Sequence, residues 1–195
     1  MIENVLERRQ TSTRSRLAVK TLVSAGIVVL ATVLPQIAHM IAGAEAGMLL
    51  MPMYLPVLLG GCLLGTRWGL AVGVISPIVS FIYTSAVIGT PMPSAARLPF
   101  MMAELAVFAA VSGLFSNKIY EKPILSVPAV ISAQLCGRGV FMISVLLFGR
   151  YAGLTGPAVW VQIRNGFAGL FVQVIAVPII IAIVGRILKG NASRD

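Results

Sequence analysis

The chain has 195 residues, of which 58% are hydrophobic and only 11% are charged, and its formal net charge is +9 at pH 7. Soluble domains carry charge on about a quarter of their residues, so this composition excludes an ordinary soluble core. One histidine, two cysteines and six acidic residues are too sparse for a metal centre of the usual kind.

Six apolar stretches separated by short polar links predict six membrane-spanning helices. A bilayer core of roughly 30 Å requires about 20 helical residues, and the apolar runs are too long and uniform for membrane β-strands. In chain order, the expected helices cover residues 17–38, 48–65, 68–88, 97–116, 126–148 and 160–188. The predicted fold class is an all-α membrane protein, a six-transmembrane-helix bundle with cytoplasmic N- and C-termini. The domains are a cytoplasmic basic tail at 1–16, the membrane domain at 17–188 and a cytoplasmic C-terminal tail at 189–195.

The distribution of positive charge fixes the expected orientation. With the N-terminus inside, the outer links hold only Arg97 and Arg150, and lysine and arginine near helix ends favour the cytoplasm. The cytoplasmic segments hold eleven: Arg8, Arg9, Arg14, Arg16, Lys20, Arg67, Lys118, Lys122, Arg186, Lys189 and Arg194. The basic balance is therefore an orientation signal that requires no nucleic-acid partner. The six expected spans also predict a multi-pass protein in contact with the lipid bilayer.

Three ionisable residues fall inside the expected spans: Glu104, Arg138 and Arg164. A charge near the bilayer centre costs about 2.5 kcal/mol or more, so such residues normally face a partner or a cavity. In one interpretation Glu104 pairs with an arginine and locks the bundle. In the other, which we favour because one carboxylate cannot neutralise two arginines, an arginine binds a substrate anion through its planar donor fork. Three nearby amides can add hydrogen bonds: Gln134, Gln162 and Asn165.

Small residues form a second pattern. Gly61, Gly65, Gly69 and Gly73 recur at four-residue spacing, which permits close approach of helices, and we interpret them as internal packing positions. On the first helix, Thr21 and Ala25 form a small-residue pair that favours a partner-docking face. The sequence offers no nucleophile–base set, phosphate loop, cofactor motif or metal-ligand cluster. We therefore expect neither an enzyme nor a cofactor.

The order of several short motifs resembles the substrate-binding S-components of energy-coupling-factor (ECF) vitamin transporters. The residues that carry it are Leu50-Met51-Pro52-Met53-Tyr54-Leu55-Pro56, then Gly65, Gly69, Gly73 and Pro77, Gly89-Thr90-Pro91, Met102-Ala103-Glu104-Leu105, and Gly169, Gln173 and Pro178. The resemblance covers nearly the whole chain, although each motif alone is unspecific. Relatives often carry a histidine at the position of Tyr54, so the ligand identity stays open.

The resemblance implies a subunit of a bacterial plasma membrane that captures a water-soluble vitamin from outside, while a membrane T-component and two ATPases supply the energy. It also implies docking on the T-component through small residues of the first helix, here Thr21 and Ala25. The two arginines favour an anionic vitamin such as pantothenate, with cobalamin or another ring-containing nutrient as alternatives. The expected substrate-binding residues are Tyr54, Glu104, Gln134, Arg138, Arg164 and Asn165.

Two other classes of function compete with this one. A self-sufficient secondary transporter would use Glu104 as its proton-coupling carboxylate, but the six helices lack evident inverted repeats. A membrane enzyme would need acids, bases and nucleophiles that the chain lacks, and a scaffold would leave the buried arginines unexplained.

Overall fold

The computed structural model describes residues 1–8, 12–149 and 156–192, with backbone alone for residues 8, 42, 44–50, 156–163, 165 and 188–192. Throughout these ranges the regular structure is helical, which confirms the all-α fold class. The elements are α1 (Ile2–Arg8), α2 (Thr13–Leu50), α3 (Tyr54–Leu64), α4 (Thr66–Tyr83), a π-helical turn η1 (Thr84–Ile88), α5 (Leu98–Leu114), α6 (Ser116–Glu121), a 3-10 turn η2 (Pro123–Leu125), α7 (Ser126–Phe148) and α8 (Gly156–Ala192).

The described parts of the chain contain four helices long and apolar enough to cross a membrane, as a multi-pass protein would. These segments are Thr13–Ile41, Thr66–Ile88, Pro123–Phe148 and Gly166–Ile187. The other two expected spans form shorter apolar helices, α3 with 11 residues and α5 with 17.

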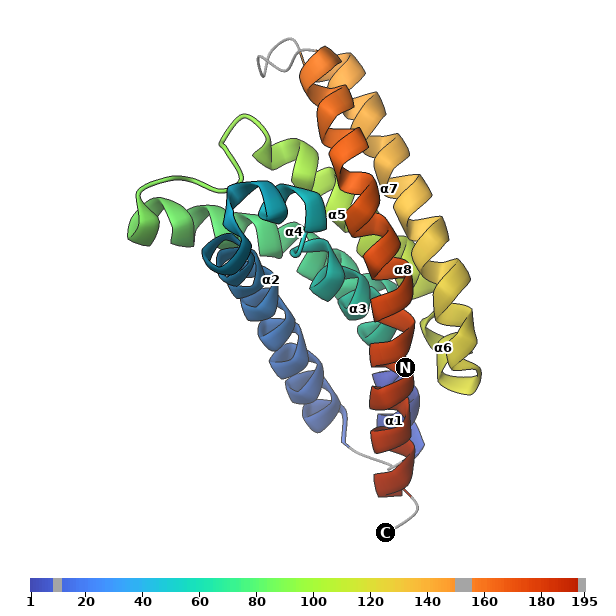
Figure 1. The fold of residues 1–195 in the computed structure, drawn as a ribbon. Helices are drawn as coiled ribbons and strands as arrows, with labels where there is room; N and C mark the ends of the chain where they lie inside the picture. Colours follow the sequence, from blue (N-terminus) through green and yellow to red (C-terminus); the bar gives the residue numbers. More distant parts are fainter. Residues whose placement is uncertain (9–11, 150–155, 193–195) are drawn as a thin grey trace.

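The helices are arranged around α5, which packs against α3, α4 and α7, while α8 packs against α2 and α7 (Figure 1). The N-terminus and the C-terminal end of α8 lie at the same end of the bundle, together with α1 and α6 (Figure 1).

Glycines allow the central helices to approach each other closely. A Cβ atom on Gly73 would lie 2.5 Å from the carbonyl oxygen of Leu105, and one on Gly69 would lie 2.9 Å from the Cα of Gly61. The interpretation of these glycines as internal packing positions is confirmed. Gly65 has a different role, because its φ of 86° forms the sharp link between α3 and α4.

The expected N-terminal tail contains a short packed helix, α1. The side chains of Met1, Val5 and Leu6 are buried, and Met1 lies against Gly185 of α8. On its polar side, Glu3 forms a 3.1 Å ion pair with Lys20 of α2. The buried side chains of Met1, Val5 and Leu6 form an apolar face of α1 that packs against the end of the bundle. The sequence did not predict this face, because the arginines at positions 8 and 9 made the segment look like a polar tail.

Candidate functional site

The second expected helix, 48–65, is interrupted in the structure. Met51 adopts a left-handed conformation with φ 43° and ψ 56°, and α3 begins only at Tyr54. Pro52 explains the break, because proline lacks an N–H donor and disfavours helical geometry in the residue before it. At 1.5 Å per residue, α3 is only about 16 Å long, roughly half of the thickness of a bilayer core.

Side-chain amides satisfy the backbone at this break. The carbonyl oxygen of Met51 accepts hydrogen bonds from the Tyr54 N–H (3.0 Å) and from Nε2 of Gln173 on α8 (3.3 Å). Gln134 of α7 donates through Nε2 to Gln173 Oε1 (3.3 Å) and to the Leu170 carbonyl (3.1 Å). Non-helical backbone is tolerated at membrane depth only where protein or water satisfies it. At this break Gln173 donates to the Met51 carbonyl, and Gln134 holds the Gln173 side chain in place.

A buried charged cluster lies beside the break. Glu104 of α5 is fully buried, and its Oε2 accepts a 2.6 Å hydrogen bond from the Tyr54 hydroxyl. Its Oε1 lies 2.8 Å from Nη1 of Arg138 on α7, at ion-pair distance but without hydrogen-bond alignment. The Arg138 guanidinium also lies 5.3 Å from the centre of the Tyr54 ring, a cation–π contact. The formal charges of Glu104 and Arg138 are opposite and equal.

Arg138 keeps donors that the described residues do not fully satisfy. Its Nη2 lies 2.7 Å from the Met51 sulfur, which is a weak acceptor. Its Nε has no hydrogen-bond partner among the described residues, and Arg138 is only 9% exposed. A buried unsatisfied donor costs about 1–3 kcal/mol. Gly166 of α8 leaves room for this contact, because a Cβ there would lie 2.5 Å from Met51 Cε and 3.0 Å from Arg138 Nη2.

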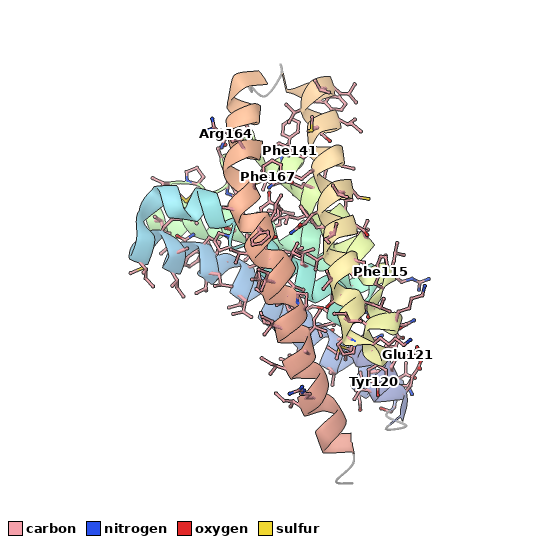
Figure 2. The ribbon with its side chains drawn as sticks, turned by 45° about the vertical axis from the view of Figure 1, so that its right-hand side comes forward. Phe115, Tyr120, Glu121, Phe141, Arg164 and Phe167 are labelled. Carbon is pink, nitrogen blue, oxygen red and sulfur yellow. The ribbon has the colours of Figure 1, made fainter. Side chains whose placement is uncertain are left out.

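The structure brings four of the predicted site residues together and separates another. Tyr54, Glu104 and Arg138 form the charged cluster, and Gln134 joins it through the amides. Arg164 is exposed, and Figure 2 shows it on the upper part of α8, on the side away from α7. The pairing of Glu104 with an arginine is therefore observed, with Arg138 as the partner.

The other predicted residues are Gln162, Asn165, Thr21 and Ala25. The side chains of Gln162 and Asn165 lie outside the part that the structure describes. Thr21 and Ala25 lie on the exposed face of α2, where the Thr21 hydroxyl donates to the Leu17 carbonyl at 2.9 Å. Their role in partner docking stays a prediction.

Sequence reasoning named Gln173 only through the family motif, and it missed Met51 and Gly166 as site residues. A residue directly before proline in a predicted helix was the available signal for Met51.

Comparison of the chain with protein-family models, with curated proteins and with solved structures found no match.

Proposed function

We propose that the chain is the substrate-binding S-component of an ECF-type transporter in a bacterial plasma membrane. In this proposal six helices cross the bilayer with both termini cytoplasmic, and a water-soluble vitamin is captured from outside. A T-component and two ATPase subunits supply the energy. One observation carries the proposal. Met51, Tyr54, Glu104 and Gln173, which come from three separate motifs of the resemblance, meet in one buried polar network.

The geometry of the network supports a binding role. Membrane carriers place their substrate sites where helices are interrupted near the bilayer midplane, because free backbone groups are available there. The interruption at Met51–Met53 has this form, and α3 begins beside the charged cluster. Ionisable groups at membrane depth normally mark a substrate site or a structural pair. Glu104 and Arg138 already form a pair, so a ligand would have to use the donors that the pair leaves free.

The Glu104–Arg138 ion pair limits which groups of the site can bind a ligand. Arg138 faces Glu104 and Arg164 is exposed, so two free arginines do not converge on one anion. A pantothenate-like anion would bind to the donors of Arg138 that Glu104 does not occupy. Cobalamin or another uncharged ring-containing vitamin would instead use Tyr54 and the glutamine amides.

The proposal is tested by thermal unfolding of the detergent-purified protein against a panel of water-soluble vitamins. A ligand at about 100 times its Kd stabilises the folded state by about 2.7 kcal/mol, which raises the Tm by about 5–10 °C for a chain of this size. Pantothenol, the uncharged alcohol analogue of pantothenate, tests whether the carboxylate is needed. We expect one vitamin to raise the Tm, and a panel without any shift would contradict the proposal.

Matched variants locate the site. The double variant Glu104→Gln, Arg138→Gln removes the charged cluster and should abolish the ligand-induced shift. Arg164→Gln removes an exposed arginine from α8 and should leave the shift unchanged. A shift that survives the double variant but is lost in Arg164→Gln would place binding away from the helix break.

The secondary-transporter alternative has one observation in its favour, the complete burial of Glu104. Reconstitution of the chain alone in liposomes separates the two functions. Vitamin uptake driven by a proton gradient without partner subunits, and lost in Glu104→Gln, would favour the alternative. Binding without such uptake favours the S-component.

A further inference from the structure

One edge of the Arg138 guanidinium lacks a strong hydrogen-bond acceptor. Nη1 faces Glu104. Among the described residues, Nη2 has the Met51 sulfur as its hydrogen-bond partner and Nε has none. Nε and Nη2 lie on the same edge of the planar fork, which matches the two oxygens of a carboxylate. A thioether cannot fill this edge, because it is a weak acceptor at a single atom.

Met51 is held in a strained backbone conformation. Its φ of 43° is uncommon for a residue other than glycine, and it directly precedes Pro52, where extended geometry is favoured. Rotation of the Met51 side chain alone would withdraw the sulfur from Arg138, while the Met51 carbonyl keeps its two hydrogen bonds. Its unbranched side chain has several rotatable bonds, so it can repack elsewhere. Gly166 contributes no side chain at this point, so the space beside Nη2 is filled by Met51 itself.

We propose that the Met51 thioether is a displaceable internal ligand of Arg138. The substrate then presents a carboxylate to Nε and Nη2 in place of Met51 Sδ, while Glu104 keeps its contact with Nη1. This inference rests on the proposed function for its substrate site. It deepens that function, because it names carboxylates as the substrate class and makes Met51 a residue that determines specificity. The exchange is favourable because an oxygen anion forms a stronger hydrogen bond with arginine than a neutral sulfur does.

The test follows the methionine methyl groups by NMR in detergent-purified protein labelled with ¹³C-methyl methionine. The resonance absent from Met51→Leu identifies Met51, with Met51→Ala as a second variant if the first does not fold. Acetate serves as a simple carboxylate probe, acetamide as its uncharged control and pantothenate as the vitamin. Met53, which is also buried and lies two residues away, supplies the matched control variant Met53→Leu.

We expect acetate and pantothenate to shift the Met51 resonance, while acetamide leaves it in place. Pantothenate should bind about three- to tenfold more tightly to Met51→Leu than to the wild type, because a competing weak hydrogen bond is removed. Met53→Leu should bind with unchanged affinity.

The outcomes separate this inference from the proposed function. If a vitamin binds while the Met51 resonance stays in place and Met51→Leu binds it with unchanged affinity, the S-component proposal stands and the displacement is wrong. If acetate shifts Met51 but no vitamin binds, the displacement stands and the vitamin function fails. If neither carboxylate shifts the resonance, Met51 is a fixed structural contact and the inference is overturned.

Discussion

Replacing Arg138 by glutamine is expected to destabilise the folded protein by about 3–5 kcal/mol, because Glu104 then stays buried without its counter-charge. Glu104 has no exposed surface, and the Tyr54 hydroxyl is the hydrogen-bond donor left to it among the described residues. Thermal or denaturant unfolding in detergent measures the change. Arg164→Gln is the matched control, and as an exposed substitution it should stay within about 0.5 kcal/mol of the wild type.

The double variant Glu104→Gln, Arg138→Gln distinguishes a charge effect from a packing effect. Two neutral amides of similar size remove the uncompensated carboxylate, so most of the lost stability should return. If the double variant is as unstable as Arg138→Gln, the arginine stabilises the bundle through its packing. If Arg138→Gln is as stable as Arg164→Gln, the pair contributes nothing to stability.

The sequence predicted helix boundaries well where polar or helix-ending residues interrupt the apolar stretches. The expected helices 126–148 and 97–116 agree closely with α7 (Ser126–Phe148) and α5 (Leu98–Leu114). Each follows a polar or proline-rich link, so both composition and helix-ending residues indicate the boundary.

Pro52 predicted an interruption of the apolar run 48–65 but not its form, because hydropathy reports which residues prefer lipid and not how the backbone turns. Pro52 and Pro56 both lie in the apolar run 48–65, and a proline kink and a full break look alike in sequence. The break is stabilised by Gln173, which is 122 positions away along the chain. Such a long-range contact cannot be derived from local pattern.

The sequence singled out Glu104, Arg138 and Arg164 as ionisable residues inside expected spans, but it did not predict which arginine pairs with Glu104. Either arginine could have supplied the counter-charge. Close packing of α5 on α7 decides between them, because a Cβ on Gly137 would lie 3.0 Å from the ring of Phe108. Gly137 precedes Arg138 and Phe108 lies one turn after Glu104, so this contact brings the two charges together.

Replacing Gly73 by alanine is expected to destabilise the bundle by about 1–3 kcal/mol, as overpacking of a close contact does. The added Cβ would lie 2.5 Å from the Leu105 carbonyl oxygen and 2.9 Å from the Cα of Ala106, so backbone must move and no flexible side chain can absorb the clash. Gly26→Ala is the matched control. Gly26 is an exposed helical glycine with open space around it, and alanine there should leave stability unchanged or raise it by up to about 1 kcal/mol.

The same substitution also tests how the packing of α4 on α5 supports the site. Leu105 directly follows Glu104, so a displacement of α5 at Leu105 should shift the carboxylate relative to Arg138. Gly73→Ala should therefore reduce the ligand-induced Tm shift as well as the Tm itself, whereas Gly26→Ala should change neither by much. Equal behaviour of the two alanine variants would show that α4 and α5 are not in close contact. A lower Tm with an undiminished ligand shift would show that the site is independent of this contact.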